Sequence, residues 1–432
     1  MKTKIVLLFL LGWNSIVWGQ DSVNIKQLDN ILNILVEKDY KYVSTGKNKK
    51  FPLVSAYTFT QMVKKDFSTL ITGSPENNQV GKYAALSIDK TEQSFSFSPV
   101  TYVFNGDDGT KPFNNILAIN ANGKLNNDGF FDFSNRKKFK IGISWTHLFG
   151  ISTYNYLSEL PKYKEIYQCV KEDIIKKQST ENVLEKLSNI GKDESDYKKM
   201  YHQEVEKYEN MTYKKYWTIK FLVWTKLDIG YSEDRLKIVD SINTINSITK
   251  PMDENINGSY FSFSGNAFWG HKNGFSFYAN AQISCSKKTS LSEIFSTVEW
   301  NKIHYANETN NTIYYNLSKE NVYITNTNNF FKRYKVDWSF QLLTFFPAWK
   351  DNLVGLDLNY QNKGFITPGT ETSTSTKNIF SIGIMFPLKD KNGNITINIE
   401  PFWQTISYNN YDSGENESFL GIKFGVPLNQ LF

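Results

Sequence analysis

The sequence has few of the residues that carry disulfide, metal and redox chemistry. Only two cysteines, Cys169 and Cys285, occur in 432 residues, and their surroundings differ. Two isolated cysteines provide neither a disulfide framework nor a zinc signature. No histidine has a second histidine or a cysteine at metal-ligand spacing. The four histidines are His147, His202, His271 and His304. The sequence therefore predicts no metal and no other cofactor.

Long apolar runs are also missing. Beyond the first twenty residues, no apolar stretch approaches the length of about 20 residues that a membrane-spanning helix needs. No glycine-rich phosphate loop or dinucleotide fingerprint occurs. The formal net charge is +6, and the charged residues are spread along the chain instead of clustered. Nothing in the charge pattern therefore predicts a nucleic-acid partner.

Residues 1–19 have the composition of a secretory signal peptide. Lys2 and Lys4 form a basic start, and the apolar core, 5–13, is too short to span a bilayer. We predict that the mature chain begins at Gln20 and that the protein is exported. No cysteine follows the expected cut, so a lipid-anchored start is not predicted.

What the chain does have is aromatic residues. They make up 16% of the sequence, although the mean hydropathy is only −0.44. A membrane β-barrel accounts for both values, because it needs apolar side chains on only one face of each strand and places aromatic side chains at both membrane interfaces.

The last stretch of the chain, 419–428, alternates between two kinds of side chain. Leu420, Ile422, Phe424, Val426 and Leu428 share one parity, and Phe432 has it too. Successive side chains on a strand point to opposite faces, so the stretch has one apolar face and one polar or small face.

This closing stretch resembles the last strand of Gram-negative outer-membrane β-barrels, with a porin-like architecture. Gln430 departs from the pattern, because an apolar or aromatic residue is usual there. The resemblance implies that the barrel-assembly machinery binds the C-terminal strand and reads Phe432 as the assembly signal. It also implies an outer-membrane location, in contact with lipid, after cleavage of the signal peptide.

Alternation of the same kind recurs from about Val80. The candidate strands are 83–88, 95–104, 116–121, 139–149, 217–231, 261–264, 275–283, 334–342, 354–361, 380–386, 395–400 and 419–428. Pro99 is expected at a bulge or a strand end. Short turns such as 271–274 alternate with longer polar loops such as 287–333, which is the pattern of outer-membrane barrels. We predict an all-β fold over residues 80–432: a closed antiparallel transmembrane β-barrel of about 12 strands, within a range of 10–14.

Two segments have helical spacing instead. Residues 20–79 are predicted to form an N-terminal periplasmic or plug-like segment, and 158–213 a charged three-helix insertion between two strands. The strand count places this insertion on the periplasmic side, with both chain ends, but a strand hidden in 236–248 would reverse the side. The insertion either packs only on itself or docks a periplasmic protein.

The faces opposite to the apolar ones are expected to face the lumen. Their charged residues are Lys140, Lys220, Lys226, Asp228, Lys335, Asp337, Asp357, Glu400 and Lys423. Mixed charge of this kind fits a route for polar solutes, and it equally fits ion pairs that fill the lumen.

We predict a porin-like channel for small polar solutes, with no catalytic residue. One alternative is a non-transporting barrel that binds a protein partner through its helical insertion or outer loops. A second is an outer-membrane lipase, for which His147 would be the candidate base. Ser144 and Thr146 have the opposite parity to His147, however, and the His-x-Ser arrangement of barrel phospholipases is missing.

Overall fold

The computed structural model describes most of the chain from Ile25 onwards. The described residues are 25–46, 54–72, 79–89, 93–104, 114–125, 136–149, 153–156, 163–180, 194–213, 217–240, 251–271, 273–289, 291, 298–309, 312–325, 331–348, 353–366, 374–391, 393–409 and 416–428. The predicted signal peptide and Phe432 lie outside them. The chain forms two compact units, called here the helical unit and the barrel unit, and the boundary falls within helix α3 (Ala56–Thr69), after Thr60.

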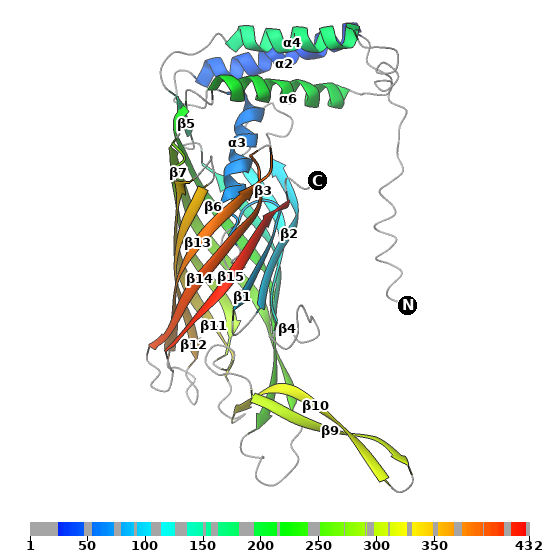
Figure 1. Ribbon diagram of the computed structural model, residues 1–432, viewed down its shortest axis with the longest axis vertical. Helices are drawn as coiled ribbons and strands as arrows, with labels where there is room; N and C mark the ends of the chain where they lie inside the picture. Colours follow the sequence, from blue (N-terminus) through cyan, green and yellow to red (C-terminus); the bar gives the residue numbers. More distant parts are fainter. Residues whose placement is uncertain are drawn as a thin grey trace. The chain divides into compact units, whose positions relative to one another are not determined.

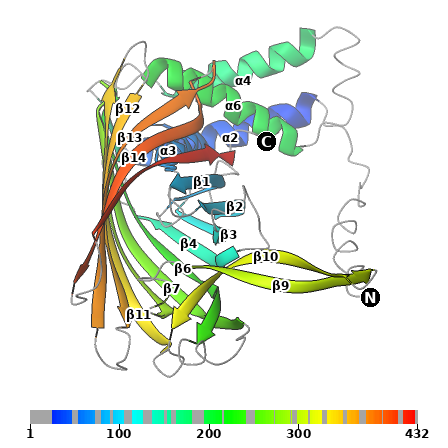
Figure 2. The ribbon, with the colours of Figure 1, turned by 60° about the horizontal axis from the view of Figure 1, so that its bottom comes forward.

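The barrel unit is a closed ring of twelve strands. These strands are β1 (Tyr83–Asp89), β2 (Gln93–Phe104), β3 (Asn115–Leu125), β4 (Arg136–Leu148), β6 (Trp217–Asp240), β7 (Met252–His271), β8 (Ser276–Lys288), β11 (Arg333–Pro347), β12 (Leu353–Ile366), β13 (Thr374–Lys389), β14 (Ile395–Asn409) and β15 (Glu417–Pro427). Each pairs antiparallel with its neighbours in the chain, and pairing of β1 with β15 and of β4 with β6 closes the ring (Figures 1 and 2). The predicted fold class is confirmed.

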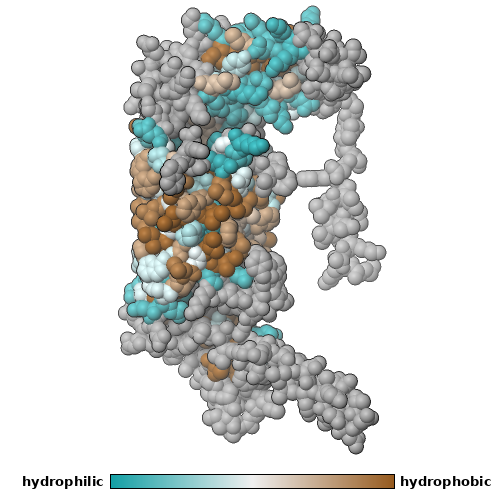
Figure 3. Space-filling view, in the orientation of Figure 1, coloured by the Kyte–Doolittle hydropathy of each residue, from teal (hydrophilic) through white to brown (hydrophobic). Residues whose placement is uncertain are grey.

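The two faces of each barrel strand differ in the way that the sequence pattern predicts. On β13, Ile382 and Ile384 are exposed, whereas Ser381, Gly383 and Met385 are buried. The same alternation repeats on the neighbouring strands, so exposed apolar side chains form a continuous outer surface (Figure 3). A closed ring leaves no strand edge with unpaired backbone groups, which is the condition for strands to survive in hydrocarbon.

Two irregularities in the sheet bear on the sequence analysis. The register of β2 against β3 shifts between Phe97 and Val100, which confirms the bulge expected at Pro99. β6 continues to Asp240 as one strand that pairs with β7. No extra ring strand therefore arises between 236 and 248. The connection between β4 and β6 starts and finishes at the end of the ring where β1 starts and β15 finishes.

The connection between β8 and β11 was expected to be a loop, and this expectation is wrong. It contains a hairpin of β9 (Val298–Thr309) and β10 (Thr312–Thr325), which extends away from the ring in Figure 1. At its base, Tyr323–Thr325 pairs parallel with β6. The alternation test missed the hairpin because these strands are outside the ring and do not present one consistently apolar face.

The helical unit contains α2 (Ile25–Gly46), α4 (Tyr163–Thr180) and α6 (Glu194–Tyr213), which lie side by side in Figure 1. Strand β5 (Thr153–Tyr156) precedes α4 in the chain. The apolar faces of these helices form the core, with Leu32, Tyr167 and Val205 among the buried side chains. The Lys171 ammonium on α4 lies 2.8 Å from the Asp29 carboxylate on α2.

Helices α4 and α6 correspond to the first and third helices expected in the insertion. The second, expected around 183–190, lies outside the described residues. α2, from the N-terminal segment, packs with α4 and α6 of the insertion in one unit. None of the helices in the described ranges is long and apolar enough to cross a membrane.

Candidate functional site

The inner wall of the barrel is polar at its middle level. Gln341 Nε2 donates to Asp357 Oδ1 across the β11–β12 pair at 2.8 Å. On β7 and β8, the Asn280 side-chain amide donates to Asn266 Oδ1, also at 2.8 Å. Buried polar groups need such partners, because an unsatisfied one costs free energy. The inner wall is therefore an ordered hydrogen-bonded surface.

Several of the predicted lumen-facing residues meet in ion pairs at this level. The Lys423 ammonium lies 2.5 Å from Glu400 Oε1 and 3.8 Å from Asp357 Oδ2, and all three side chains are buried. Lys226 lies 3.4 Å from the carboxylate of Asp228. The predicted charges are thus largely neutralised by one another where they are most deeply buried.

Gly383 makes room for this cluster. A Cβ at Gly383 would stand 2.4 Å from Glu400 Oε1, which is closer than real Cβ atoms approach. The missing side chain on β13 lets the Glu400 carboxylate on β14 lie against the neighbouring strand and reach Lys423.

Asp66, Phe67, Ile71 and Gln79 contact the inner wall, and we call the described residues 61–72 and 79–80 the plug segment. Figure 2 shows α3 on the concave side of the curved sheet. Asp66 forms an ion pair with Lys220, one of the predicted lumen residues. The ring of Phe67 packs edge-on against buried Trp224, with 4.8 Å between centroids. Side chains of β6 thus contact the plug segment.

Backbone groups of the plug segment are also bound by the wall. Asn398 Nδ2 donates to the carbonyl of Ile71 at 2.7 Å, and Lys226 Nζ donates to the carbonyl of Gln79 at 2.9 Å. A Cβ at Gly425 would stand 2.4 Å from the same Ile71 carbonyl oxygen. Gly425 therefore lets the plug segment approach β15 closely.

The remaining predicted residues lie towards the other end of the ring. Asp337 forms an ion pair with Lys288, and its second oxygen accepts from the backbone N–H of Gly364 at 3.0 Å. The Lys140 ammonium lies over the ring of Tyr260, 5.3 Å from its centroid. Lys335 is half-buried, and its Cβ lies 3.5 Å from the position of a Cβ on Gly364.

Sequence analysis did not single out Asp66, Lys288, Lys363, Lys377 or Asn398. The last four have the polar parity of their strands: Asn398 lies within the predicted strand 395–400, and an extension of the other three predicted strands by a few residues would have reached Lys288, Lys363 and Lys377. Asp66 lies on a helix whose contacts with the barrel come from far along the chain, and no local signal marks it.

A polar cluster lies on the outer face of β3 and β4. His147 Nδ1 lies 2.9 Å from Asn115 Oδ1, and Trp145 Nε1 donates to the same oxygen at 3.0 Å. Thr225 stands opposite His147 in the register between β4 and β6. The residues share one parity, so the outer face presents a histidine oriented by an amide.

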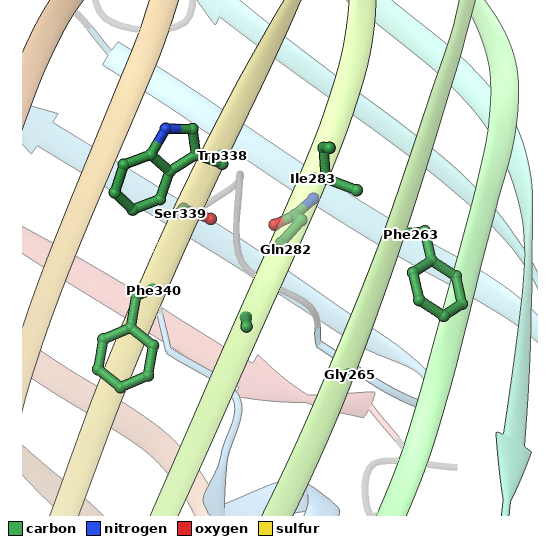
Figure 4. Close-up of a pocket in the computed structure, with 8 residues that line it drawn as sticks. Phe263, Gly265, Gln282, Ile283, Trp338, Ser339 and Phe340 are labelled. Carbon is green, nitrogen blue, oxygen red and sulfur yellow. The ribbon is translucent and has the colours of Figure 1, made fainter.

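A groove of about 550 Å³ also opens on the outer face. Small residues, Gly265 and Ala281, are direct cross-strand partners, and large side chains including Phe263, Ile283 and Phe340 rise around them (Figure 4). The groove is apolar and holds no cluster of reactive groups.

The core of the helical unit contains two buried carboxyl groups. Glu209 accepts hydrogen bonds from the backbone N–H of Ser55 at 2.8 Å and from the Tyr167 hydroxyl at 2.7 Å. Burial raises the pKa of Glu209 to about 7. Burial, and then the nearby charge of Glu209, raise the pKa of Asp39 well above its usual range. Among the described residues, no group of three or more His, Cys, Asp or Glu side chains is placed to hold a metal ion.

No family model matches the chain, and no curated protein matches it. Among solved structures, the chain is similar to the β domain of the Bordetella autotransporter BrkA, at 8% identity and a TM-score of 0.33, covering 80% of this chain and 98% of that chain. It is similar to the NanC porin at 6% identity and a TM-score of 0.31, covering 80% and 98%. The translocator domain of the autotransporter NalP from Neisseria meningitidis gives 8% identity and a TM-score of 0.27, covering 86% and 96%.

The closed ring, with its apolar outer wall and polar inner wall, defines the class: the chain has the fold of an outer-membrane β-barrel. The closed ring and its two different walls confirm the architectural resemblance drawn from the closing strand.

Proposed function

We propose that the protein lies in the outer membrane and acts as a porin-like channel for small polar solutes, narrowed at one end by the plug segment. The observation that carries the proposal is the contrast between the two walls. Apolar side chains cover the outside, whereas lysine, aspartate, glutamate and asparagine side chains line the inside. A ring of twelve strands lies between small filled barrels and wide porins, so its lumen suits a narrow aqueous path.

The connections support an orientation. The end of the ring where β1 starts also carries the short turns between β7 and β8 and between β13 and β14. Outer-membrane barrels have short periplasmic turns and longer outer loops. We therefore assign this end to the periplasm, and the plug segment narrows the channel there.

Single-channel recording with the purified full-length protein in planar bilayers tests the proposal. The wild-type protein is expected to give discrete conductance steps. Gly425→Val places a side chain where the Ile71 carbonyl lies, so it should displace the plug segment and raise the conductance.

Gly265→Val is the matched control, because a Cβ at Gly265 has no atom within 4 Å. It makes the same substitution on the outer wall and should leave the conductance unchanged. If neither the wild type nor Gly425→Val conducts at any voltage while both remain folded, the channel function is wrong.

A second candidate is hydrolysis of membrane lipid at the outer face, favoured by the hydrogen bond between His147 and Asn115. In this role His147 would act as the general base, oriented by Asn115, and Thr225 would be the nearest hydroxyl in the register. The assay is release of fatty acid from phospholipid vesicles. Hydrolysis that His147→Ala leaves at the wild-type rate, or no hydrolysis at all, rules out this activity.

A further inference from the structure

The plug segment contacts two opposite walls of the barrel. On β6, the ring of Trp224 packs against that of Phe67. On β14, Asn398 Nδ2 donates to the carbonyl of Ile71 at 2.7 Å. In the order of the ring, β14 is six strands from β6 in either direction, which is half of the twelve-strand ring. The plug segment therefore crosses the lumen from one wall to the wall that faces it.

The crossing is short and lies near one end of the ring. β6 and β14 both start at the end where β1 starts. Lys220 and Asn398 each lie three residues after the first residue of their strand. Their partners in the plug segment, Asp66 and Ile71, are five residues apart, so the chain between them spans at most about 18 Å. A few residues of the plug segment thus connect the two walls.

Inward side chains on both sides of this crossing are buried. They belong to seven strands near the same end of the ring, and none is more than 4% exposed: Tyr83, Ser98, Ile116 and Thr146 on one side, and Phe268, Tyr278, Leu343 and Met385 on the other. Inward side chains that lined an aqueous path would contact water. At the level of these described side chains, the lumen is therefore closed.

β6 holds the plug segment at two separate points. Lys220 forms an ion pair with Asp66, and Lys226 Nζ donates to the carbonyl of Gln79 at 2.9 Å. These two contacts lie thirteen residues apart in the plug segment, one before and one after Ile71. The segment is therefore attached to β6 on either side of the residue that reaches the opposite wall.

The contacts with the opposite wall centre on Ile71. Its carbonyl accepts from Asn398, and its side chain belongs to a buried cluster with Tyr83 and Ala85 of β1. The absence of a side chain at Gly425 makes room for the same carbonyl oxygen. Because a hydrogen bond to protein replaces one to water, its net contribution to stability is modest. The contact at Asn398 is thus one that the protein can break and remake.

We propose that the plug segment is an autoinhibitory gate, which keeps the channel closed while Ile71 is bound at Asn398 and opens it when Ile71 is released. This inference rests on the proposed channel function. The contacts with β6 keep the released segment attached to the barrel, so the gate closes again without refolding of the ring. The wild-type protein should accordingly open only in brief events separated by long closed periods.

Single-channel recording of the full-length protein tests the gate through the open probability. Asn398→Leu keeps the approximate size of the side chain but removes the donor to the Ile71 carbonyl, which favours release. It should raise the open probability at least tenfold, and Gly425→Val, which acts on the same carbonyl oxygen, should do the same. Asn362→Leu is the matched control, because it removes an amide that binds Asn378 at 2.6 Å on the outer wall. It should leave the open probability unchanged.

Cysteine labelling supplies a readout that does not need conductance. Ser68 is 2% exposed in the closed state, and Ser68→Cys places a thiol of similar size there. The measurement uses a background with Cys169→Ser and Cys285→Ser, so that only the new thiol reacts. A water-soluble maleimide should label Ser68→Cys slowly, and the addition of Asn398→Leu should accelerate labelling at least severalfold, whereas Asn362→Leu should not.

The outcomes separate the gate from the channel. A wild-type channel that is open most of the time, or an open probability and labelling rate that Asn398→Leu and Gly425→Val leave unchanged in folded protein, overturns the gate and leaves the channel in place. Silence of every variant in the bilayer, combined with labelling that Asn398→Leu accelerates, instead overturns the channel and retains a plug segment that is released at Asn398.

Discussion

The inner wall of the barrel and the core of the helical unit both bury charged side chains, but they stabilise them differently. In the barrel, Lys423 lies between the carboxylates of Glu400 and Asp357. In the helical unit, Glu209 accepts hydrogen bonds from hydroxyl and backbone N–H donors, and its charge acts on a second buried acid, Asp39. Ion pairing keeps a buried group charged, whereas burial without a counter-charge favours the protonated acid, and the hydrogen bonds to Glu209 oppose this only in part. The stability of the barrel should therefore depend on keeping both members of each buried ion pair. The stability of the helical unit should depend on pH.

The largest expected effect comes from removing the shared cation of the barrel cluster. Lys423→Met leaves two buried carboxylates without their ammonium partner, and breaking such a pair costs about 3–5 kcal/mol. Denaturant unfolding of the full chain in detergent, followed by the heat-dependent gel mobility of the barrel, measures the loss. Combining Lys423→Met with Glu400→Gln and Asp357→Asn should recover most of it. A single variant as stable as the wild type would show that the cluster is not electrostatically coupled.

The next effect concerns pH and the helical unit. The folded pKa of Glu209, about 7, lies above its ordinary value of 4.5, so the folded protein binds this proton more tightly than the unfolded chain. The associated stability is complete below pH 4.5 and is lost as the pH rises towards 7, by about 3 kcal/mol. Thermal melting of the full chain by far-UV circular dichroism over this pH range measures the loss.

Glu209→Gln is the control for the pH effect, because it keeps the shape of the side chain but cannot ionise. Its melting temperature should depend less on pH between 4.5 and 7 than that of the wild type. Asp39 retains its own raised pKa and contributes a remaining slope of the same sign. An unchanged slope in Glu209→Gln would assign the pH dependence elsewhere.

A smaller effect compares glycines on the two walls. A Cβ at Gly230 would stand 2.1 Å from the carbonyl oxygen of Ile141 and 2.8 Å from the Tyr260 ring, which lies over this glycine. Gly230→Ala should therefore destabilise the barrel by about 1–3 kcal/mol through overpacking. Gly265→Ala on the outer wall meets no atom within 4 Å and should be nearly neutral. Equal unfolding midpoints for the two variants would contradict the close contact.

The smallest effect is expected for an exposed ion pair. Lys198 and Glu194 lie 2.5 Å apart on the surface of α6, one helical turn from each other, and both are exposed. Lys198→Ala should cost only about 0.3–0.5 kcal/mol, because water screens the pair. The same melting measurement should barely detect it, and a loss as large as that of Lys423→Met would erase the distinction between buried and exposed charges.

Sequence alternation predicted the barrel well because one physical requirement acts on every strand. Outward side chains in the middle of each strand are mostly apolar. The alternation around Ile382 and Ile384 therefore predicts a strand even when the neighbouring strands are not known. The same alternation marked Lys423 and Glu400 as inward but not as partners, because pairing depends on the register between β14 and β15. The register is set by turns and bulges, which the alternation of apolar and polar residues does not predict.

The plug segment and the helical core were less accessible to sequence analysis. The contact of Asn398 with Ile71 joins residues far apart in the chain, and nothing local to either residue predicts it. Glu209 did carry a signal. It follows Tyr201 and Val205 at helical spacing, so an acid occupied a position on the apolar face of α6. An acidic residue among apolar residues on one helix face indicates a carboxyl group that is buried and hydrogen-bonded.

The hairpin of β9 and β10 is inserted between two strands that already pair with each other. β8 and β11 are hydrogen-bonded from Lys288 and Arg333 at one end to Ser276 and Phe345 at the other, and this ladder needs no contribution from the hairpin. The segment can therefore be exchanged, lengthened or diversified without rebuilding the ring. Natural sequence variation should accumulate in this hairpin while the barrel wall stays the same. Engineered epitopes or tags should be tolerated at the same place.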